Sequence, residues 1–430
     1  MKKVAFITLG CKVNQYETNA MTQQLLENGY EIVEHTEKAD IYIVNTCTVT
    51  NISDRKSRQM LRRVKGLNPK ALVIACGCYV QVAKKEVEQI EEIDLALGNN
   101  EKKEIVKYIE EWFKKDTINN RIDDVMQQRD FVDFGNVVYT EKTRAVIKVQ
   151  DGCDRFCSYC IIPYARGRVR SRKPENILSE IRKIAEKGIQ EVVITGIHIA
   201  SYGKDFQDSY QLIDLLEEIN TIEGIKRIRL GSLEPLLITQ RFLNRLKKLE
   251  KICHHFHLSL QSGCDETLKR MNRRYTTDQF RKIVQLLRNT YSDVMLTTDI
   301  IVGFPGETQA EFETTYQFLK EINFYKMHIF KYSPRKGTKA AQMKEQVSGD
   351  KKEQRSRALM DLSDENQKKY HQSYLNREVE VLFEEEKNGT YHGHTDNYIL
   401  AYCKTSQKIE NQIRKVQCKE IETDHILVEL

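Results

Sequence analysis

The sequence predicts an α/β protein built from three parts: a parallel sheet with helices, an incomplete β/α barrel and a small all-β module. Two series of alternating strand-like and helix-like segments, followed by a β-rich tail, support this prediction. A chain of 430 residues is too long for one ordinary domain, so two or three are expected. Hydrophobic residues make up 40% of the chain, which is enough to fill a core in each part.

The first part, residues 1–115, alternates between apolar runs and amphipathic segments. The apolar runs are Val4–Leu9, Ile41–Val44 and Leu72–Ala75, and the amphipathic segments between them are Tyr16–Asn28 and Asp54–Lys65. Continuous apolar runs are typical of parallel strands that are buried on both faces. The pattern predicts a Rossmann-like parallel-sheet domain, and the polar segment 116–140 that follows predicts a linker.

The second part, residues 141–371, contains six strand-like runs separated by helix-like segments. The expected strands are Ala145–Val149, Glu191–Thr195, Lys226–Leu230, His255–Leu260, Met295–Val302 and Met327–Tyr332. The expected helices are Glu175–Lys187, Gln211–Ile219, Thr277–Asn289 and Gln309–Ile322, with a charged helical stretch at 349–370. Because eight β/α repeats close the usual barrel, six repeats predict a partial (β/α)6 barrel.

The third part, residues 372–430, changes to short β-rich runs. These runs are Glu378–Phe383, Tyr398–Tyr402 and Ile426–Glu429, with an Asn388-Gly389 turn between the first two. Short strands bounded by turn residues predict a small all-β module.

Charge and the start of the chain limit the classes of protein to consider. The net charge is +6, but acidic residues outnumber basic ones from Ser373 onward, so the preceding body is basic and suits a polyanionic ligand. The first apolar run is too short for a signal peptide, and no stretch approaches the roughly 20 apolar residues that cross a membrane. A cytoplasmic protein with no membrane contact is expected, so its eleven cysteines indicate metal or redox chemistry and not disulfides.

Cys153, Cys157 and Cys160 directly follow the first strand of the predicted barrel, with the spacing C-x3-C-x2-C. Three thiolates within eight residues can bind a four-iron cubane and leave its fourth iron open. The amino and carboxylate groups of S-adenosylmethionine (SAM) can chelate such an iron, and parallel barrels hold their chemistry at this end of the strands. A structural zinc site is the alternative, but it normally needs four ligands, and no suitable fourth ligand lies nearby in the sequence.

The cysteine triplet, with Tyr159 before its last member, resembles the radical SAM superfamily. Further motifs resemble its methylthiotransferase branch: GSLEP at 231–235, HLSLQSGCD at 257–265, RMNRRYT at 270–276, DIIVGFPGET at 299–308 and FKYSPRKGT at 330–338. The residues expected to bind SAM are Tyr159, Gly196, Ser232, Glu234, Gln261, Ser262, Arg273, Asp299, Gly303 and Tyr332. Most of them follow a predicted strand and would surround one mouth of the barrel; the alternative is that they only complete loops and tight turns.

Cys11, Cys47 and Cys78 each follow an apolar strand of the first part. The carboxyl ends of parallel strands share one edge, so these thiols can converge and hold a second cubane, although cysteine is also a common core residue. The same positions resemble the cluster ligands of the methylthiotransferase N-terminal domain. That resemblance selects Cys78, which follows glycine, and leaves Cys76 to pack in the sheet. Cysteines without partner spacing are expected to be structural: Cys253, Cys264, Cys403 and Cys418.

The tail resembles a TRAM domain, a small β-barrel found on RNA-modifying enzymes, through EVEVLFEE at 378–385 and GHTDNYILA at 393–401. The expected RNA contacts are Arg55, Arg58 and Arg62 on a basic helix, Arg166, Arg168 and Arg170 after the cysteine triplet, and Lys387 and Tyr398 in the tail. The alternatives are that the basic helix is only a solvated face, and that the loop arginines bind the SAM carboxylate or pack between domains.

The resemblance implies insertion of a methylthio group, with one SAM supplying the methyl group and a second supplying a radical. The opening LGCKVNQYET resembles the subgroup that modifies N6-threonylcarbamoyladenosine at tRNA position 37, 3′ of the anticodon. The subgroups that act on isopentenyladenosine in tRNA or on a ribosomal-protein aspartate differ after the first cysteine. Other rivals are a radical SAM enzyme that acts on protein and a non-catalytic iron–sulfur RNA-binding protein. The implied partners are the tRNA anticodon stem-loop, a reductant such as flavodoxin or ferredoxin, and a sulfur source, and a monomer is expected.

Overall fold

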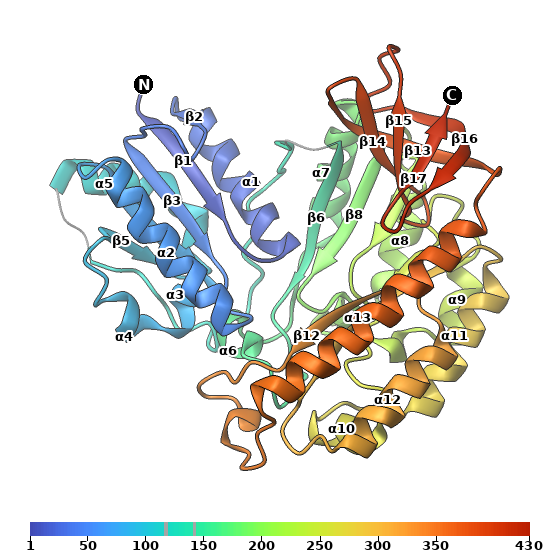
Figure 1. Ribbon diagram of the computed structural model, residues 1–430. Coiled ribbons are helices and arrows are strands. Elements are labelled where there is room, and N and C mark those ends of the chain that lie inside the picture. The colour runs from blue at the N-terminus through green and yellow to red at the C-terminus, as the bar shows by residue number, and fades with distance from the viewer. Residues whose placement is uncertain (116–118, 141–142) are drawn as a thin grey trace.

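The computed structural model describes residues 1–115, 119–140 and 143–430. Its N-terminal domain is a five-stranded, fully parallel sheet in the order β2-β1-β3-β4-β5 (Figure 1). The strands are β1 Lys3–Thr8, β2 Glu31–Val33, β3 Ile41–Thr46, β4 Leu72–Gly77 and β5 Leu95–Leu97. The two edge strands were not predicted, because a three-residue strand leaves no periodic signal in the sequence.

Helices cover both faces of this sheet, so both faces are buried cores. They are α1 Lys12–Glu27, α2 Asn51–Leu67, α3 Cys78–Val82, α4 Lys84–Val87 and α5 Ile105–Lys115. Thr50 caps α2 by accepting a hydrogen bond from the Ser53 N–H. Helices α1, α2 and α3 begin at or soon after the carboxyl ends of β1, β3 and β4, which places three strand-to-helix turns on one edge of the sheet.

The central domain is the predicted partial barrel of six parallel strands. These are β6 Arg144–Asp151, β8 Glu191–Gly196, β9 Arg227–Leu230, β10 His255–His257, β11 Met295–Val302 and β12 Lys326–Lys331, with the short β7 Arg170–Ser171 antiparallel to β6. Only isolated bridges such as Leu233↔Leu258 join β9 to β10, and β12 does not pair with β6. The barrel is therefore open on one side, and the start of the N-terminal domain's α1 lies against β6 and β8.

Helices on the outside of the barrel bury its largest core. They are α7 Pro174–Glu186, α8 Leu212–Asn220, α9 Gln240–Leu246, α10 Asp265–Arg270, α11 Thr277–Thr290 and α12 Gln309–Ile322. The short α6, Ile162–Arg166, packs instead on α3 of the N-terminal domain. The long α13, Gly349–Gln372, packs along the free edge of the barrel, where Ser363 accepts a hydrogen bond of 3.0 Å from the Met327 N–H. No helix among the described residues is long and apolar enough to cross a membrane.

The C-terminal module is a closed five-stranded barrel in the order β13-β14-β15-β17-β16. Its strands are β13 Glu378–Lys387, β14 Thr390–Thr395, β15 Leu400–Lys404, β16 Ile413–Ile421 and β17 Ile426–Glu429. It docks on the amino ends of the central strands. Arg229 donates hydrogen bonds to the carbonyl oxygens of Asp396 and Thr395, at 2.8 and 3.2 Å, and Arg144 pairs with Glu384 at 2.8 Å. The predicted fold class is confirmed in all three parts.

The segment predicted as a linker is a packed connection where the structure describes it. Residues 116–118 of that segment, and 141–142 after it, lie outside the described residues. In 119–140, the Asp123 carbonyl accepts a hydrogen bond of 2.7 Å from Gln81, and the Val137 N–H donates one of 2.8 Å to Glu180. The segment thus packs on both the N-terminal and the central domain.

Candidate active site

Cys153, Cys157 and Cys160 lie together in the loop that leaves β6, and all three are half-buried. Two backbone hydrogen bonds of 3.0 Å shape this loop, from the Cys153 N–H to the Gly167 carbonyl and from the Cys160 N–H to the Cys157 carbonyl. Gly152 has φ of +71°, and a Cβ there would lie 1.8 Å from the Arg168 carbonyl oxygen, so only glycine fits. Burial raises the pKa of Cys160 to about 12, so this thiol needs a metal to become a thiolate near neutral pH.

Arg273 connects this cysteine loop to the rest of the barrel mouth. Its guanidinium donates to the Cys157 sulfur at 3.4 Å and to the Glu234 carboxylate at 3.0 Å. Burial would raise the pKa of Glu234, but His198 and Arg273 hold it below its usual value. A cysteine thiol, a fixed cation and an ionised carboxylate therefore adjoin one another, which suits a ligand with both amino and carboxylate groups.

Cys11, Cys47 and Cys78 follow the adjacent parallel strands β1, β3 and β4. The loops approach so closely that a Cβ on Gly10, at φ of +105°, would lie 2.8 Å from Cys47 Cβ. Cys47 and Cys78 are buried and Cys11 is accessible, so the group is closed on the sheet side and open on the other. Cys76 is fully buried in the sheet core, where the sequence analysis expected it.

Arg166, the last residue of α6, joins the two cysteine groups. It belongs to the segment that carries Cys153–Cys160, yet its Nε donates to the Cys78 sulfur at 3.2 Å. The same guanidinium pairs with Glu17 of α1, which also binds Lys102 at 2.6 Å and Lys148 at 2.7 Å. Burial would raise the pKa of Glu17, but these three cations hold it well below its usual value. This buried charge network fixes the N-terminal domain on the barrel.

A small apolar cavity of about 220 Å³ lies beside the barrel cysteines. Cys160, Tyr159, Gln261, Asp299 and Tyr332 line it together with aliphatic side chains and Phe330. The Tyr332 hydroxyl is buried and has no hydrogen-bond partner among the described residues. A flat heteroaromatic group with polar edges fits these walls.

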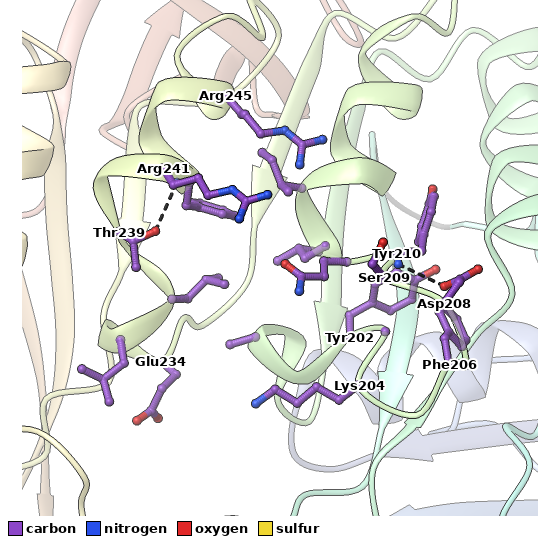
Figure 2. Close-up of a pocket in the computed structure, with 18 of the residues that line it drawn as sticks. Tyr202, Lys204, Phe206, Asp208, Ser209, Tyr210, Glu234, Thr239, Arg241 and Arg245 are labelled. Carbon is purple, nitrogen blue, oxygen red and sulfur yellow. Dashed lines mark hydrogen bonds between the residues drawn. The ribbon is translucent and has the colours of Figure 1, made fainter.

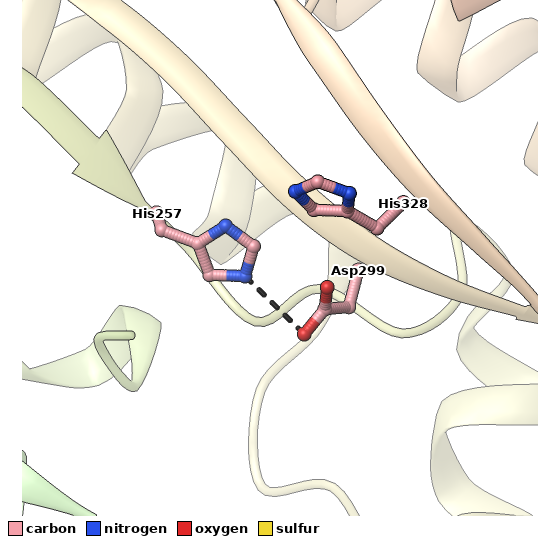
Figure 3. A group of neighbouring side chains, drawn as sticks. All are labelled: His257, Asp299 and His328. Atoms are coloured by element: carbon pink, nitrogen blue, oxygen red, sulfur yellow. Dashed lines mark ion pairs between the residues drawn. The ribbon is translucent and has the colours of Figure 1, made fainter. Parts of the chain in front are cut away.

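A larger cavity of about 480 Å³, here called the central cavity, lies inside the barrel between the start of α1 and the C-terminal module. Asp299 lines both cavities, so this residue lies between them. Figure 3 shows Asp299 beside His257 and His328, and the His257 Nε2 to Asp299 Oδ2 distance is 3.2 Å. One ligand atom from each of the three lies within 4.8 Å of the others, which is close enough for a shared cation or for hydrogen bonds to a purine edge.

A third cavity, of about 500 Å³, opens on the outer side of the barrel mouth. Figure 2 shows its two walls, one carrying Tyr202 and Lys204 and the other carrying Glu234, Arg241 and Arg245. Arg155 from the cysteine loop also lines it. Burial lowers the pKa of Lys204. The cavity borders Glu234 and is a polar extension of the barrel mouth.

The remaining expected SAM residues do not all face a cavity. Ser232 lines the central cavity, and Gly196 packs at the end of β8 against the Gln150 carbonyl. Ser262 instead lies 3.3 Å from the Thr315 hydroxyl of α12, and Gly303 makes room for Lys352 of α13. These two residues line none of the cavities described above, and their assignment to SAM stays a prediction.

The expected RNA contacts divide by exposure. Arg55, Arg62, Arg168 and Lys387 are exposed, while Arg58 is half-buried and donates to the Tyr79 hydroxyl at 3.2 Å. Arg166 and Arg170 are at most 1% exposed, so their assignment to RNA is wrong, and they pack between the domains. Tyr398 has φ of +79° and faces the central cavity between His255 and His394, with both ring centroids 4.7 Å away.

Several site residues were missed by the sequence analysis. Lys12, His257 and His328 line the central cavity, and Glu17 holds the charge network together. The sequence offered a signal only for Lys12, which directly follows Cys11 and could have been expected near that cysteine group. The histidines and Glu17 gave none, since nothing local shows which long-range partners they meet.

Known proteins match the chain over almost its whole length. A model of the radical SAM superfamily matches residues 147–319, and one described as uncharacterized protein family UPF0004 matches 3–98. Threonylcarbamoyladenosine tRNA methylthiotransferase MtaB of Bacillus subtilis is 40% identical over 97% of this chain and 94% of its own length. The tRNA-2-methylthio-N6-dimethylallyladenosine synthase of Caldicellulosiruptor saccharolyticus is 35% identical over 97% and 90%. The chain belongs to the radical SAM methylthiotransferase family.

Solved structures agree on the fold. The radical SAM methyltransferase TsrM of Kitasatospora setae has a TM-score of 0.56 at 16% identity, covering 77% of this chain and 73% of its own. The cobalamin-dependent SAM radical enzyme OxsB has a TM-score of 0.52 at 14% identity, covering 86% and 56%.

Family membership confirms the prediction of a transferase and its cofactors. SAM and two [4Fe–4S] clusters serve this family, and the residues present fit them. Each cysteine group offers three thiols, and in each an arginine donates to one sulfur. Such donors stabilise negative charge on cluster sulfur.

Proposed function

We propose that the chain converts N6-threonylcarbamoyladenosine at tRNA position 37 to its 2-methylthio derivative. The observation that carries the proposal is that Asp299 lines two cavities, one beside each cysteine group. Cys160 lines the apolar cavity, Lys12 beside Cys11 lines the central cavity, and Asp299 lines both. A base in the central cavity lies between the two groups. The relatives at 40% identity, named for this substrate, support the choice of nucleoside.

We assign the radical SAM cluster to Cys153, Cys157 and Cys160 and the auxiliary cluster to Cys11, Cys47 and Cys78. The bound cofactors supply a carbon radical and a methylated sulfur, which together can functionalise an unactivated C–H bond. Arg273 and Glu234 hold the charged groups of SAM beside Cys157, and Tyr159, Gln261 and Tyr332 surround its adenosyl part. Asp299 and His257 orient the target base.

The RNA side of the proposal uses the exposed basic residues and the C-terminal module. Arg55, Arg62, Arg168 and Lys387 contact the phosphates of the anticodon stem-loop. Tyr398 offers a ring inside the central cavity, on which the base can stack once it has turned out of the RNA.

The proposed domains are 1–115, 141–371 and 372–430, with the connection 116–140. The enzyme acts as a cytoplasmic monomer with a reductant of the flavodoxin or ferredoxin class and a separate sulfur source.

Nucleoside mass spectrometry of tRNA tests the proposal. Total tRNA from a strain that lacks the gene is compared with tRNA after the gene or its Cys157→Ala version is restored. The 2-methylthio form of threonylcarbamoyladenosine is expected only with the unaltered gene. Appearance of 2-methylthio-isopentenyladenosine would show that the chain has the activity for which the 35%-identical relative is named. A methylthio group on a ribosomal protein with unchanged tRNA would overturn the RNA substrate.

A further inference from the structure

Lys12 places an unneutralised cation in the central cavity. Its side chain is exposed to the cavity, and it pairs with no carboxylate among the described residues. Arg229 and Lys326 line the same cavity, so further cations lie near this ammonium group.

Three of the charged groups that share the cavity with Lys12 already have partners, and the ammonium group of Lys326 is the fourth. Arg229 binds Glu191 at 2.7 Å and carbonyl oxygens of the C-terminal module. The two carboxylates of the cavity are also engaged, Asp299 with His257 at 3.2 Å and Asp424 with His425 at 2.8 Å. A ligand that fills the cavity and displaces water from Lys12 must supply a negative charge, because desolvating an unpaired ammonium group is costly.

We propose that Lys12 binds the carboxylate of the threonyl arm and so selects this substrate over bases with an apolar arm. This inference rests on the proposed function and names the residue that reads its substrate. In adenine, carbon 2 and carbon 6 flank the same ring nitrogen, and carbon 6 carries the N6 arm. A base that presents carbon 2 to the cluster beside Cys11 therefore brings its N6 arm close to the next residue, Lys12. An isopentenyl arm carries no charge and would leave the ammonium group desolvated and unpaired.

Binding to three anticodon stem-loops tests this assignment in the anaerobic, cluster-loaded enzyme. The first stem-loop carries threonylcarbamoyladenosine, the second carries its threonyl carboxamide, and the third carries isopentenyladenosine. Dissociation constants are measured by fluorescence anisotropy for the wild type, Lys12→Gln and Lys12→Arg. Lys326→Gln is the matched control, since Lys326 lines the same cavity from β12. Iron content and the visible spectrum of each variant show whether both clusters remain.

Lys12→Gln should weaken binding of the carboxylate stem-loop by about 10- to 100-fold, the range for a hydrogen bond between charged groups. It should leave binding of the carboxamide stem-loop unchanged, and Lys12→Arg should retain most of the affinity. Lys326→Gln should affect all three RNAs equally and weakly. An equal loss on all three RNAs would overturn the assignment and indicate a phosphate contact. Unchanged binding of the carboxylate stem-loop by Lys12→Gln would overturn it too.

Failure of the proposed function has a different signature. In that case the wild-type enzyme would not methylthiolate the threonylcarbamoyl stem-loop at all, whatever the behaviour of the variants. If the wild type converts that RNA but does not distinguish carboxylate from carboxamide, the proposed function stands and the role of Lys12 is refuted.

Discussion

Replacement of Glu17 by glutamine tests the buried charge network that joins the first two domains. Glu17 is fully buried and binds Arg166, Lys102 and Lys148, so the substitution leaves three cations with less negative charge between them. The amide NH₂ of glutamine would also face an ammonium group. Breaking a buried ion pair by neutralising one partner costs about 3–5 kcal/mol. For domains of this size, that corresponds to a fall of about 10 °C in the unfolding midpoint.

Thermal unfolding of the anaerobic, cluster-loaded protein, followed by circular dichroism, measures this loss. The midpoint of the first transition is compared, since a three-part protein need not unfold in two states. Glu27→Gln on the same helix is the control, because Glu27 is exposed and its loss should change stability by less than about 0.5 kcal/mol. The pKa of Glu17 is well below its usual range, so its carboxylate is ionised in the folded protein at neutral pH. The loss of stability in Glu17→Gln should therefore be constant between pH 6 and 9. It should shrink only below about pH 4.3, the pKa of a glutamate in the unfolded chain.

The reasoning would be refuted if Glu17→Gln and Glu27→Gln had the same midpoint. A loss that varied between pH 6 and 9 would equally show that another group carries the effect. Limited proteolysis gives an independent measurement: cleavage within 119–140 should become faster in Glu17→Gln alone, because this segment packs on both domains.

Three further predictions follow from the site. Gly10→Ala should lower iron content by about half while RNA-independent SAM cleavage persists, because its Cβ would lie 2.8 Å from Cys47 Cβ; retention of full iron would contradict the placement of the auxiliary cluster. Cys157→Ala should abolish 5′-deoxyadenosine formation, measured by chromatography, whereas Cys76→Ala should keep both clusters and lose only stability, by about 1–3 kcal/mol. Arg229→Gln should release the C-terminal module and expose its junction to protease, while exposed Arg414→Gln should not; equal digestion of the two would argue against docking through Arg229.

Particular elements show why prediction succeeded in some places and failed in others. The strand Met295–Val302 and the helix Gln309–Ile322 were predicted with the bounds they have, because their apolar pattern is long and regular. Arg166 and Arg170 were assigned to RNA because they are basic and follow the cysteine loop. Their burial depends on Glu17 and Asp151, which lie in other elements, and no local pattern reveals such partners.

The sequence by itself determined the class of chemistry, because cluster ligation is encoded locally. Cys153, Cys157 and Cys160 lie within eight residues, and Cys11, Cys47 and Cys78 each follow a strand whose end is visible as an apolar run. Only the tertiary structure decided which residues of the three parts line one cavity. Lys12, Asp299 and Tyr398 come from three different domains and meet in one cavity because the barrel is open towards α1 and its floor is covered by the C-terminal module. Contacts between distant segments depend on how domains pack, and the sequence periodicity that predicts each element carries no information about that packing.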